Sequence, residues 1–88
     1  MITVKRFTAP WCAPCRMLGP MFKQMEQDMP DVKFETIDVD EFPEQASEQG
    51  VRSVPTVLVH SSTTDKTISL VGANSKTAYL NAMEAVQL

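Results

Sequence analysis

The sequence predicts an α/β fold whose elements follow one another in the order β-α-β-α-β-β-α. Two observations support this prediction. Runs of apolar and β-branched residues alternate with segments whose apolar residues recur at helical spacing, and Gly or Pro lies at most of the boundaries. The first part of such a chain forms a parallel βαβ unit, and the second forms an antiparallel ββα unit. Together these units predict a four-stranded mixed sheet with helices on both faces.

The parallel unit begins with an extended apolar segment, Ile2–Thr8, which is typical of a strand. The helix that follows the two cysteines is expected to continue to Met29, because Pro30 cannot extend it, and to kink at Gly19-Pro20. A second strand is predicted over Val32–Val39, where apolar and polar residues alternate imperfectly.

A short helix is predicted between the two halves of the chain. Pro43 suits its first turn, and Gly50 closes it after Gln49, because glycine adopts the left-handed conformation without steric cost. We expect the first and last helices to share one face of the sheet, so that only this short helix covers the other. That arrangement accounts for the polar residues Thr3 and Lys5 in the first strand.

An antiparallel hairpin and a final helix complete the chain. The β-branched runs Thr56–His60 and Thr67–Val71 predict the two strands of the hairpin, and Gly72 ends the sheet. Ser75 is expected to cap the final helix, because its hydroxyl can accept a hydrogen bond from a free backbone N–H. The apolar side of this helix contains Ala78, Leu80, Ala82, Met83, Ala85 and Val86.

The length and composition describe one small globular domain that covers residues 1–88. Of the 88 residues 43% are hydrophobic, and folding should bury roughly 60–68% of the unfolded surface. The formal net charge is −3 and the basic residues are dispersed, so nucleic acid is not an expected partner. No apolar stretch approaches the ~20 residues that span a bilayer, and no apolar run of signal-peptide length follows Lys5 and Arg6. We therefore expect a cytoplasmic monomer without membrane contact.

Both cysteines of the chain lie in the segment Trp11-Cys12-Ala13-Pro14-Cys15, where the first strand gives way to the first helix. Free N–H groups and the positive end of the helix dipole stabilise an anion there, which lowers the pKa of an exposed thiol from its free value of roughly 8.5. Cys12 is predicted to be this thiol. Because a cytoplasmic C-x-x-C pair is more often catalytic than structural, a redox site is the leading hypothesis.

Two other uses of a C-x-x-C pair fit the sequence less well. A structural zinc ion takes four ligands, and beyond the cysteines the chain offers only His60 and scattered carboxylates, so we expect no metal site. A structural disulfide stabilises most when it closes a long loop, whereas this one would enclose only Ala13 and Pro14.

Several other residues are assigned no functional role. His60 is interpreted as a surface histidine, because nothing in the sequence places it near Cys12. Arg16 is either a solvated arginine or a charge that favours the Cys12 thiolate. Four acidic residues are interpreted as a solvated edge, because the chain lacks the glycine-containing loop of a calcium site. They are Asp38, Asp40, Glu41 and Glu44. A stripe of methionines on the first helix is interpreted as core, and it comprises Met17, Met21, Met25 and Met29.

Three local signatures give the chain a resemblance to the thioredoxin family over nearly its whole length. They are Trp11-Cys12-Ala13-Pro14-Cys15 followed by Pro20, Gly50-Val51-Arg52-Ser53-Val54-Pro55-Thr56, and Val71-Gly72-Ala73. The resemblance implies the thioredoxin fold in a short form, with a cis peptide bond between Val54 and Pro55 that faces the cysteines. It also implies that four residues support the active site, namely Trp11, Ala13, Pro14 and Pro55. The substrate groove would be lined by Trp11, Val54, Pro55, Gly72 and Ala73.

The chain departs from the family pattern at two buried positions. The family's buried acid falls at Arg6, and its lysine partner falls at Thr36. Ala13 also replaces the usual glycine, whereas Pro14 is retained. Thioredoxins of ordinary length have a further strand and helix before the active-site strand, so these 88 residues approach the size of a glutaredoxin. Arg6 either points toward Cys15, where its charge would favour thiolates, or extends to solvent along an uncovered strand, and we prefer the second interpretation.

The resemblance implies a protein disulfide reductase. The Cys12 thiolate attacks a disulfide of a substrate protein, and Cys15 attacks the resulting mixed disulfide to release the reduced substrate. A thioredoxin reductase that draws on NADPH is implied as the electron source, so no bound cofactor is expected. Two alternatives remain, namely a glutaredoxin that uses glutathione and a non-catalytic accessory subunit that binds a partner through the same groove. Trp11 and Ala13-Pro14 favour a thioredoxin over a glutaredoxin.

Overall fold

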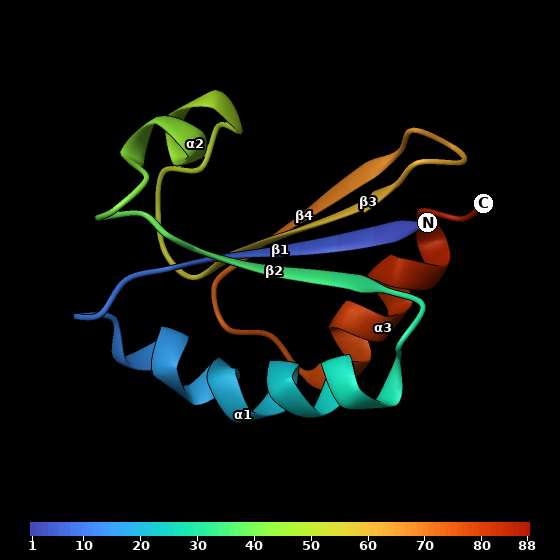
Figure 1. Cartoon of the computed structure of the whole chain (residues 1–88), viewed down its shortest axis with the longest axis horizontal. Helices are drawn as coiled ribbons and strands as arrows, with labels where there is room; N and C mark the ends of the chain where they lie inside the picture. Colours follow the sequence, from blue (N-terminus) through green and yellow to red (C-terminus); the bar gives the residue numbers. More distant parts are fainter.

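The computed structural model describes residues 1–88 and contains the helices and strands in the predicted order (Figure 1). Their bounds are β1 Ile2–Thr8, α1 Ala13–Asp28, β2 Lys33–Asp38, α2 Pro43–Glu48, β3 Thr56–Ser61, β4 Thr67–Val71 and α3 Lys76–Ala85. The predicted fold class is therefore confirmed, and the differences are confined to the ends of elements. None of the helices is both long and apolar enough to cross a membrane.

The ends of α1 and β2 differ slightly from the prediction. The helix α1 ends at Asp28, because Met29 leaves the helical region with φ −127° and ψ 72°, although its N–H still donates to the Met25 carbonyl. Pro20 lies inside α1 and does not end it. The strand β2 is shorter than predicted at both ends, so Val32 and Val39 flank it.

β1 lies inside the sheet, whose strand order is β2-β1-β3-β4. It runs parallel to β2 and antiparallel to β3, and β3 pairs antiparallel with β4. Because β1 and β2 are parallel, their carboxyl ends meet at one edge, where Thr8 is the register partner of Asp38. The segment that carries the two cysteines leaves the sheet at this edge.

The helices α1 and α3 cover one face of the sheet, as the sequence predicts, and α2 lies on the other (Figure 1). The face beneath α1 and α3 holds the larger core. An edge-to-face contact joins Phe22 of α1 to Tyr79 of α3, with ring centroids 5.0 Å apart. The buried residues of this core are Ile2, Val4, Leu18, Phe22, Met25, Val57, Val59, Tyr79, Ala82, Met83 and Val86.

The opposite face is only partly covered. A small core beneath α2 consists of Phe7, Ile37, Ala46 and Leu58. Beyond α2 the sheet faces an open hollow of about 440 Å³, and its lining is mostly polar. Thr3 and Lys5 of β1 lie in this hollow, so the polar residues of the first strand occur where no helix packs against the sheet.

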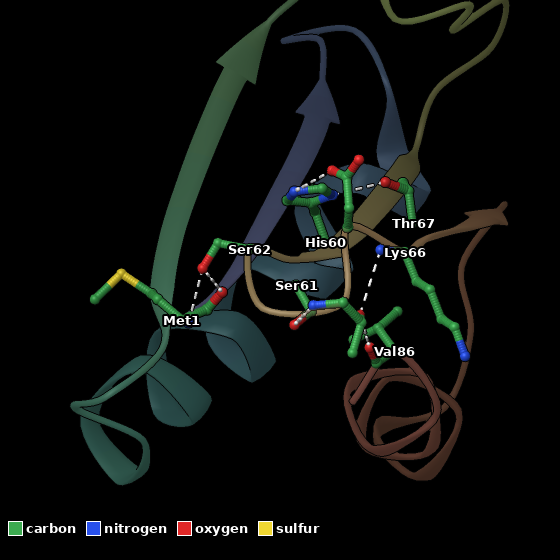
Figure 2. A network of polar contacts seen from close by, with 9 residues as sticks. Met1, His60, Ser61, Ser62, Lys66, Thr67 and Val86 are labelled. Atoms are coloured by element: carbon green, nitrogen blue, oxygen red, sulfur yellow. Dashed lines mark hydrogen bonds and ion pairs between the residues drawn. The ribbon is translucent and has the colours of Figure 1, made fainter. Parts of the chain in front are cut away.

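The tip of the β3–β4 hairpin holds both ends of the chain (Figure 2). The amino group of Met1 donates to the Ser62 hydroxyl at 2.9 Å, and the Thr64 hydroxyl donates to the Val86 carbonyl. The His60 ring contacts the Thr67 hydroxyl at 2.8 Å and the Asp65 carboxylate at 3.6 Å. His60 therefore participates in the polar network of the hairpin.

Candidate active site

Cys12 occupies the N-cap of α1, and Cys15 lies in its first turn. The residues between β1 and α1 reverse the chain, and the Cys12 N–H donates to the Ala9 carbonyl at 3.2 Å. Cys12 has an extended backbone, with φ −92° and ψ 104°, and its sulfur accepts a hydrogen bond from the Cys15 N–H at 3.2 Å. This sulfur thus takes the place of the side-chain oxygen that commonly caps a helix.

The two cysteines form a disulfide whose Cα atoms are 5.2 Å apart. Cys12 is 4% exposed and Cys15 is 0% exposed, so the predicted nucleophile is the slightly more exposed residue of the pair. The expectation of an exposed Cys12 thiol is wrong for this oxidised state, because Val39 and Val54 pack against the small cluster that Cys12 and Cys15 form with Ala9.

The surroundings of the disulfide favour negative charge on a reduced sulfur. The first turn of α1 contains no acidic residue, so no carboxylate within that turn offsets the positive end of the helix dipole. Arg16 donates to the Pro10 carbonyl at 2.7 Å, which fixes the turn before the helix. The exposed Arg16 side chain is therefore held against the active-site turn by this hydrogen bond.

Arg6 points from β1 toward the first turn of α1, which corrects the preferred sequence interpretation. Its Nη1 atom donates to the Cys15 carbonyl at 3.2 Å, and Nη2 donates to the Thr36 hydroxyl at 3.4 Å. The guanidinium lies over the Phe22 ring, 5.3 Å from its centroid. The stem does not extend along an uncovered strand, because α1 covers this face of β1 (Figure 1).

Burial lowers the pKa of Arg6, and Coulombic interaction with Tyr79 acts in the opposite direction. Arginine nevertheless remains a cation in proteins, so this side chain cannot accept a proton. The position that holds an acid in the thioredoxin pattern is thus occupied by a permanent positive charge.

The loop before β3 faces the cysteines. The peptide bond between Val54 and Pro55 is cis, Pro55 is buried, and Val54 packs against the cluster that contains Cys12 and Cys15. The Gly72 N–H donates to the Pro55 carbonyl at 2.8 Å, and Gly72 has φ +84°, which glycine adopts without strain. Val54, Pro55 and Gly72 are therefore held together by direct contacts, and exposed Ala73 follows Gly72.

Trp11 stands beside the disulfide with 67% of its surface exposed. Its indole Nε1 donates to the Asp40 carboxylate at 3.1 Å, while the Asp40 N–H donates to the Asp38 carboxylate at 2.8 Å. A shallow hollow of about 150 Å³ lies next to the indole. It is lined by Trp11, Val39, Ala46, Val51, Arg52, Ser53 and Val54.

Asp40 is a site residue that the sequence analysis missed. The sequence predicts that Asp40 belongs to a solvated edge, whereas in the structure its carboxylate accepts the hydrogen bond of the exposed Trp11 indole. One signal could have found it. Because parallel neighbours end at the same sheet edge, a polar residue directly after the second strand comes near the residues that follow the first.

Met17 is another residue whose expected position is wrong. The methionine stripe was predicted to be core, and Met25 is fully buried, but Met17 is 78% exposed two residues after Cys15. Large apolar side chains are thus exposed on both sides of the active-site turn, at Trp11 and at Met17.

No three His, Cys, Asp or Glu side chains come together in a group that could hold a metal ion. The fold and the site define a protein with a dithiol–disulfide pair at a helix N-terminus, opposite a proline loop. This class can store two electrons in its own sulfur atoms.

Comparison with known proteins agrees with this class. The thioredoxin family model matches residues 1–85. The chain is 46% identical to thioredoxin of Bacillus subtilis (strain 168) over 59 residues, which are 66% of this chain and 57% of that protein. It is 38% identical to thioredoxin 1 of Synechococcus elongatus over 79 residues, which are 89% of this chain and 73% of that protein.

Solved structures give the same result. A mutant thioredoxin from Halobacterium salinarum NRC-1 is 31% identical and superposes with a TM-score of 0.86, covering 99% of this chain and 75% of that one. Oxidised mitochondrial thioredoxin 3 from Saccharomyces cerevisiae is 33% identical, with a TM-score of 0.82 and coverage of 94% and 77%. The chain belongs to the thioredoxin family. It spans between 35% and 73% of the length of the curated relatives it matches.

Proposed function

We propose that the chain is a thiol-disulfide oxidoreductase that reduces disulfides of other proteins. The observation that supports this proposal is the Cys12–Cys15 disulfide, in which Cys12 is the N-cap of α1 and the slightly more exposed residue of the pair. When the pair is reduced, the Cys15 N–H that already contacts the Cys12 sulfur stabilises the thiolate and lowers its pKa.

The reaction moves two electrons from the dithiol to the substrate. The Cys12 thiolate attacks one sulfur of a substrate disulfide, which forms a mixed disulfide and expels the other substrate sulfur as a thiolate. Cys15 then loses its proton, attacks the Cys12 sulfur and expels the second substrate sulfur. The released thiolates take up protons, and the protein is left with the disulfide described above.

The groove beside Cys12 is the proposed substrate site. An extended substrate segment would lie against exposed Trp11 and the loop that contains Val54 and Pro55, with Gly72 and Ala73 on its other side. The position of Val54 against the cysteine cluster supports this assignment. Ala13 and Pro14 are exposed in the first turn, so their role is to shape the approach to the sulfurs.

Electrons would come from NADPH through a thioredoxin reductase, and no bound cofactor takes part. Membership of the thioredoxin family supports this source over glutathione. We propose a cytoplasmic location, because a reducing compartment helps to return the Cys12–Cys15 pair to the dithiol state. We also propose a monomer, because a monomer leaves the groove accessible to substrate proteins. The glutaredoxin alternative is not favoured.

The test is turnover of insulin disulfides with dithiothreitol as electron source. We expect the wild-type protein to accelerate insulin reduction and to lose this activity in Cys12→Ser. Glutathione should support turnover poorly, and efficient turnover by glutathione would favour the glutaredoxin alternative. A wild-type protein without activity toward any protein disulfide would point to the accessory-subunit alternative.

A further inference from the structure

The strongest unexplained feature near the disulfide is the buried side of Arg6. Its Nη1 atom contacts the carbonyl of the residue that carries the resolving sulfur, at 3.2 Å. Its Nε atom is buried and has no hydrogen-bond partner. Burying part of a charged side chain costs free energy, because the buried atoms lose their hydrogen bonds to water. The contacts that Arg6 makes in return therefore need an explanation.

The charge of Arg6 is not neutralised by a carboxylate. The charged and titratable groups around it are Lys23 and Glu26 of α1, Glu35 of β2 and Tyr79 of α3. Glu35 pairs with Lys33 at 3.2 Å, and Arg6 takes part in no ion pair. Its positive charge therefore has no direct ionic partner and lies against the Cys15 backbone in a partly desolvated region, where charges interact more strongly than in water.

We propose that Arg6 is a positioning residue that stabilises the reduced pair and so makes the disulfide more oxidising than it would be beside a neutral residue. This inference rests on the proposed function for its biological meaning. The neutral disulfide gains little from a nearby cation, whereas a thiolate gains directly. The cation thus shifts the two-electron equilibrium toward the dithiol.

Arg6 also changes how Cys15 becomes reactive. In the resolving step a new bond forms between the Cys15 and Cys12 sulfurs, and the bond from Cys12 to the substrate sulfur breaks. The proton of Cys15 goes to water or to the substrate thiolate already released, because a guanidinium cannot accept it. The Arg6 contact with the Cys15 carbonyl places a positive charge against the backbone of the residue whose thiolate this step requires.

A purely structural role is the competing explanation. Arg6 of β1 contacts Cys15 and Phe22 of α1 and Thr36 of β2. In this explanation these contacts only stabilise the packing of the first turn of α1 against the sheet. The two explanations differ in what a substitution changes. Loss of a structural contact lowers the free energy of unfolding. Loss of the charge alters the reduction potential and the thiolate pKa of the folded protein.

The experiment compares variants that separate charge from shape. Arg6→Met and Arg6→Gln remove the charge, and Arg6→Lys retains it. Lys23→Gln is the matched control, because Lys23 lines the same small hollow without contacting Cys15. Each protein is equilibrated in glutathione redox buffers, the thiols are alkylated, and the reduced and oxidised fractions are measured by mass. Thiolate formation is followed by ultraviolet absorbance as the pH is raised.

We expect the equilibrium of Arg6→Met and Arg6→Gln to shift toward the disulfide by roughly tenfold, which is a potential about 30 mV more negative. The pH at which thiolate forms should rise in the same two variants. Arg6→Lys and Lys23→Gln should stay close to wild type. Two neutral variants are included so that a folded one is measured if the other is too unstable.

The inference is overturned if the neutral variants keep the wild-type potential, or if Lys23→Gln shifts it as much as they do. It is also overturned if Arg6→Lys behaves like Arg6→Met. None of these measurements needs a protein substrate. If the proposed reductase function is wrong, the wild-type protein will be inactive in the insulin assay. If the proposed role of Arg6 is wrong, the reduction potentials of the variants will show it, so the two hypotheses are tested separately.

Discussion

The indole Nε1 of Trp11 donates a hydrogen bond to the Asp40 carboxylate, 3.1 Å away. This contact joins the turn before α1 to the segment that follows β2. The indole is otherwise largely exposed beside the disulfide, so Asp40 determines which way its apolar face points. The proposed substrate groove therefore depends on Asp40 through its hydrogen bond to Trp11.

Replacing Asp40 by Ala should weaken substrate binding. The indole would then sample several orientations, and an exposed hydrogen bond to a charged group contributes about 1 kcal/mol. We expect KM for insulin reduction to rise by roughly fivefold, with kcat little changed. Asp40→Asn keeps an acceptor oxygen and should remain near wild type. Equal kinetics in Asp40→Ala and wild type would show that the contact does not orient the groove.

Two neighbouring residues of α1 should differ sharply in their effect on stability. Leu18 is buried in the larger core, whereas Met17 is exposed. Leu18→Ala should lower the free energy of unfolding by about 2–5 kcal/mol, because it removes buried atoms and leaves a cavity. Met17→Ala should change it by less than about 0.5 kcal/mol. Denaturant unfolding of both variants checks this, and a large loss in Met17→Ala would contradict the described orientation of α1.

Alkylation of the reduced protein should distinguish the two thiols. We expect iodoacetamide to modify Cys12 first, and at a lower pH than a free cysteine requires, because Cys12 is the N-cap of α1 and Cys15 is fully buried. Peptide mapping after brief labelling over pH 5 to 9 gives the rate for each residue. Equal labelling of both sulfurs throughout this range would refute the assignment of Cys12 as the nucleophile.

Much of the fold could be predicted because it depends on patterns that repeat. The β-branched runs at Thr56–His60 and Thr67–Val71 form the expected hairpin, and Gly50 closes α2 with φ +73°. Ser75 caps α3 as expected, since its hydroxyl accepts from the Ala78 N–H. Each of these features is decided within a few residues of the chain, where local preferences act directly.

Features that depend on the angular position or path of one side chain were harder to predict. Methionines four residues apart advance about 40° around a helix at each step, so a stripe that includes buried Met25 has left the core by Met17. Arg6 has a stem long enough to reach either solvent or α1. Only the packing of α1 over β1, which brings the Cys15 carbonyl and the Phe22 ring within reach, selects the second path.

The most direct test of the account is a trapping experiment with the two single cysteine variants. Each is mixed with an excess of a protein that contains an accessible disulfide, and the products are separated without reductant. Cys15→Ser should accumulate a mixed disulfide through Cys12, because the resolving thiol is absent. Cys12→Ser should form almost none, since Cys15 is fully buried. A mixed disulfide that forms equally in both variants, or only through Cys15, would contradict the central claim that Cys12 attacks and Cys15 resolves.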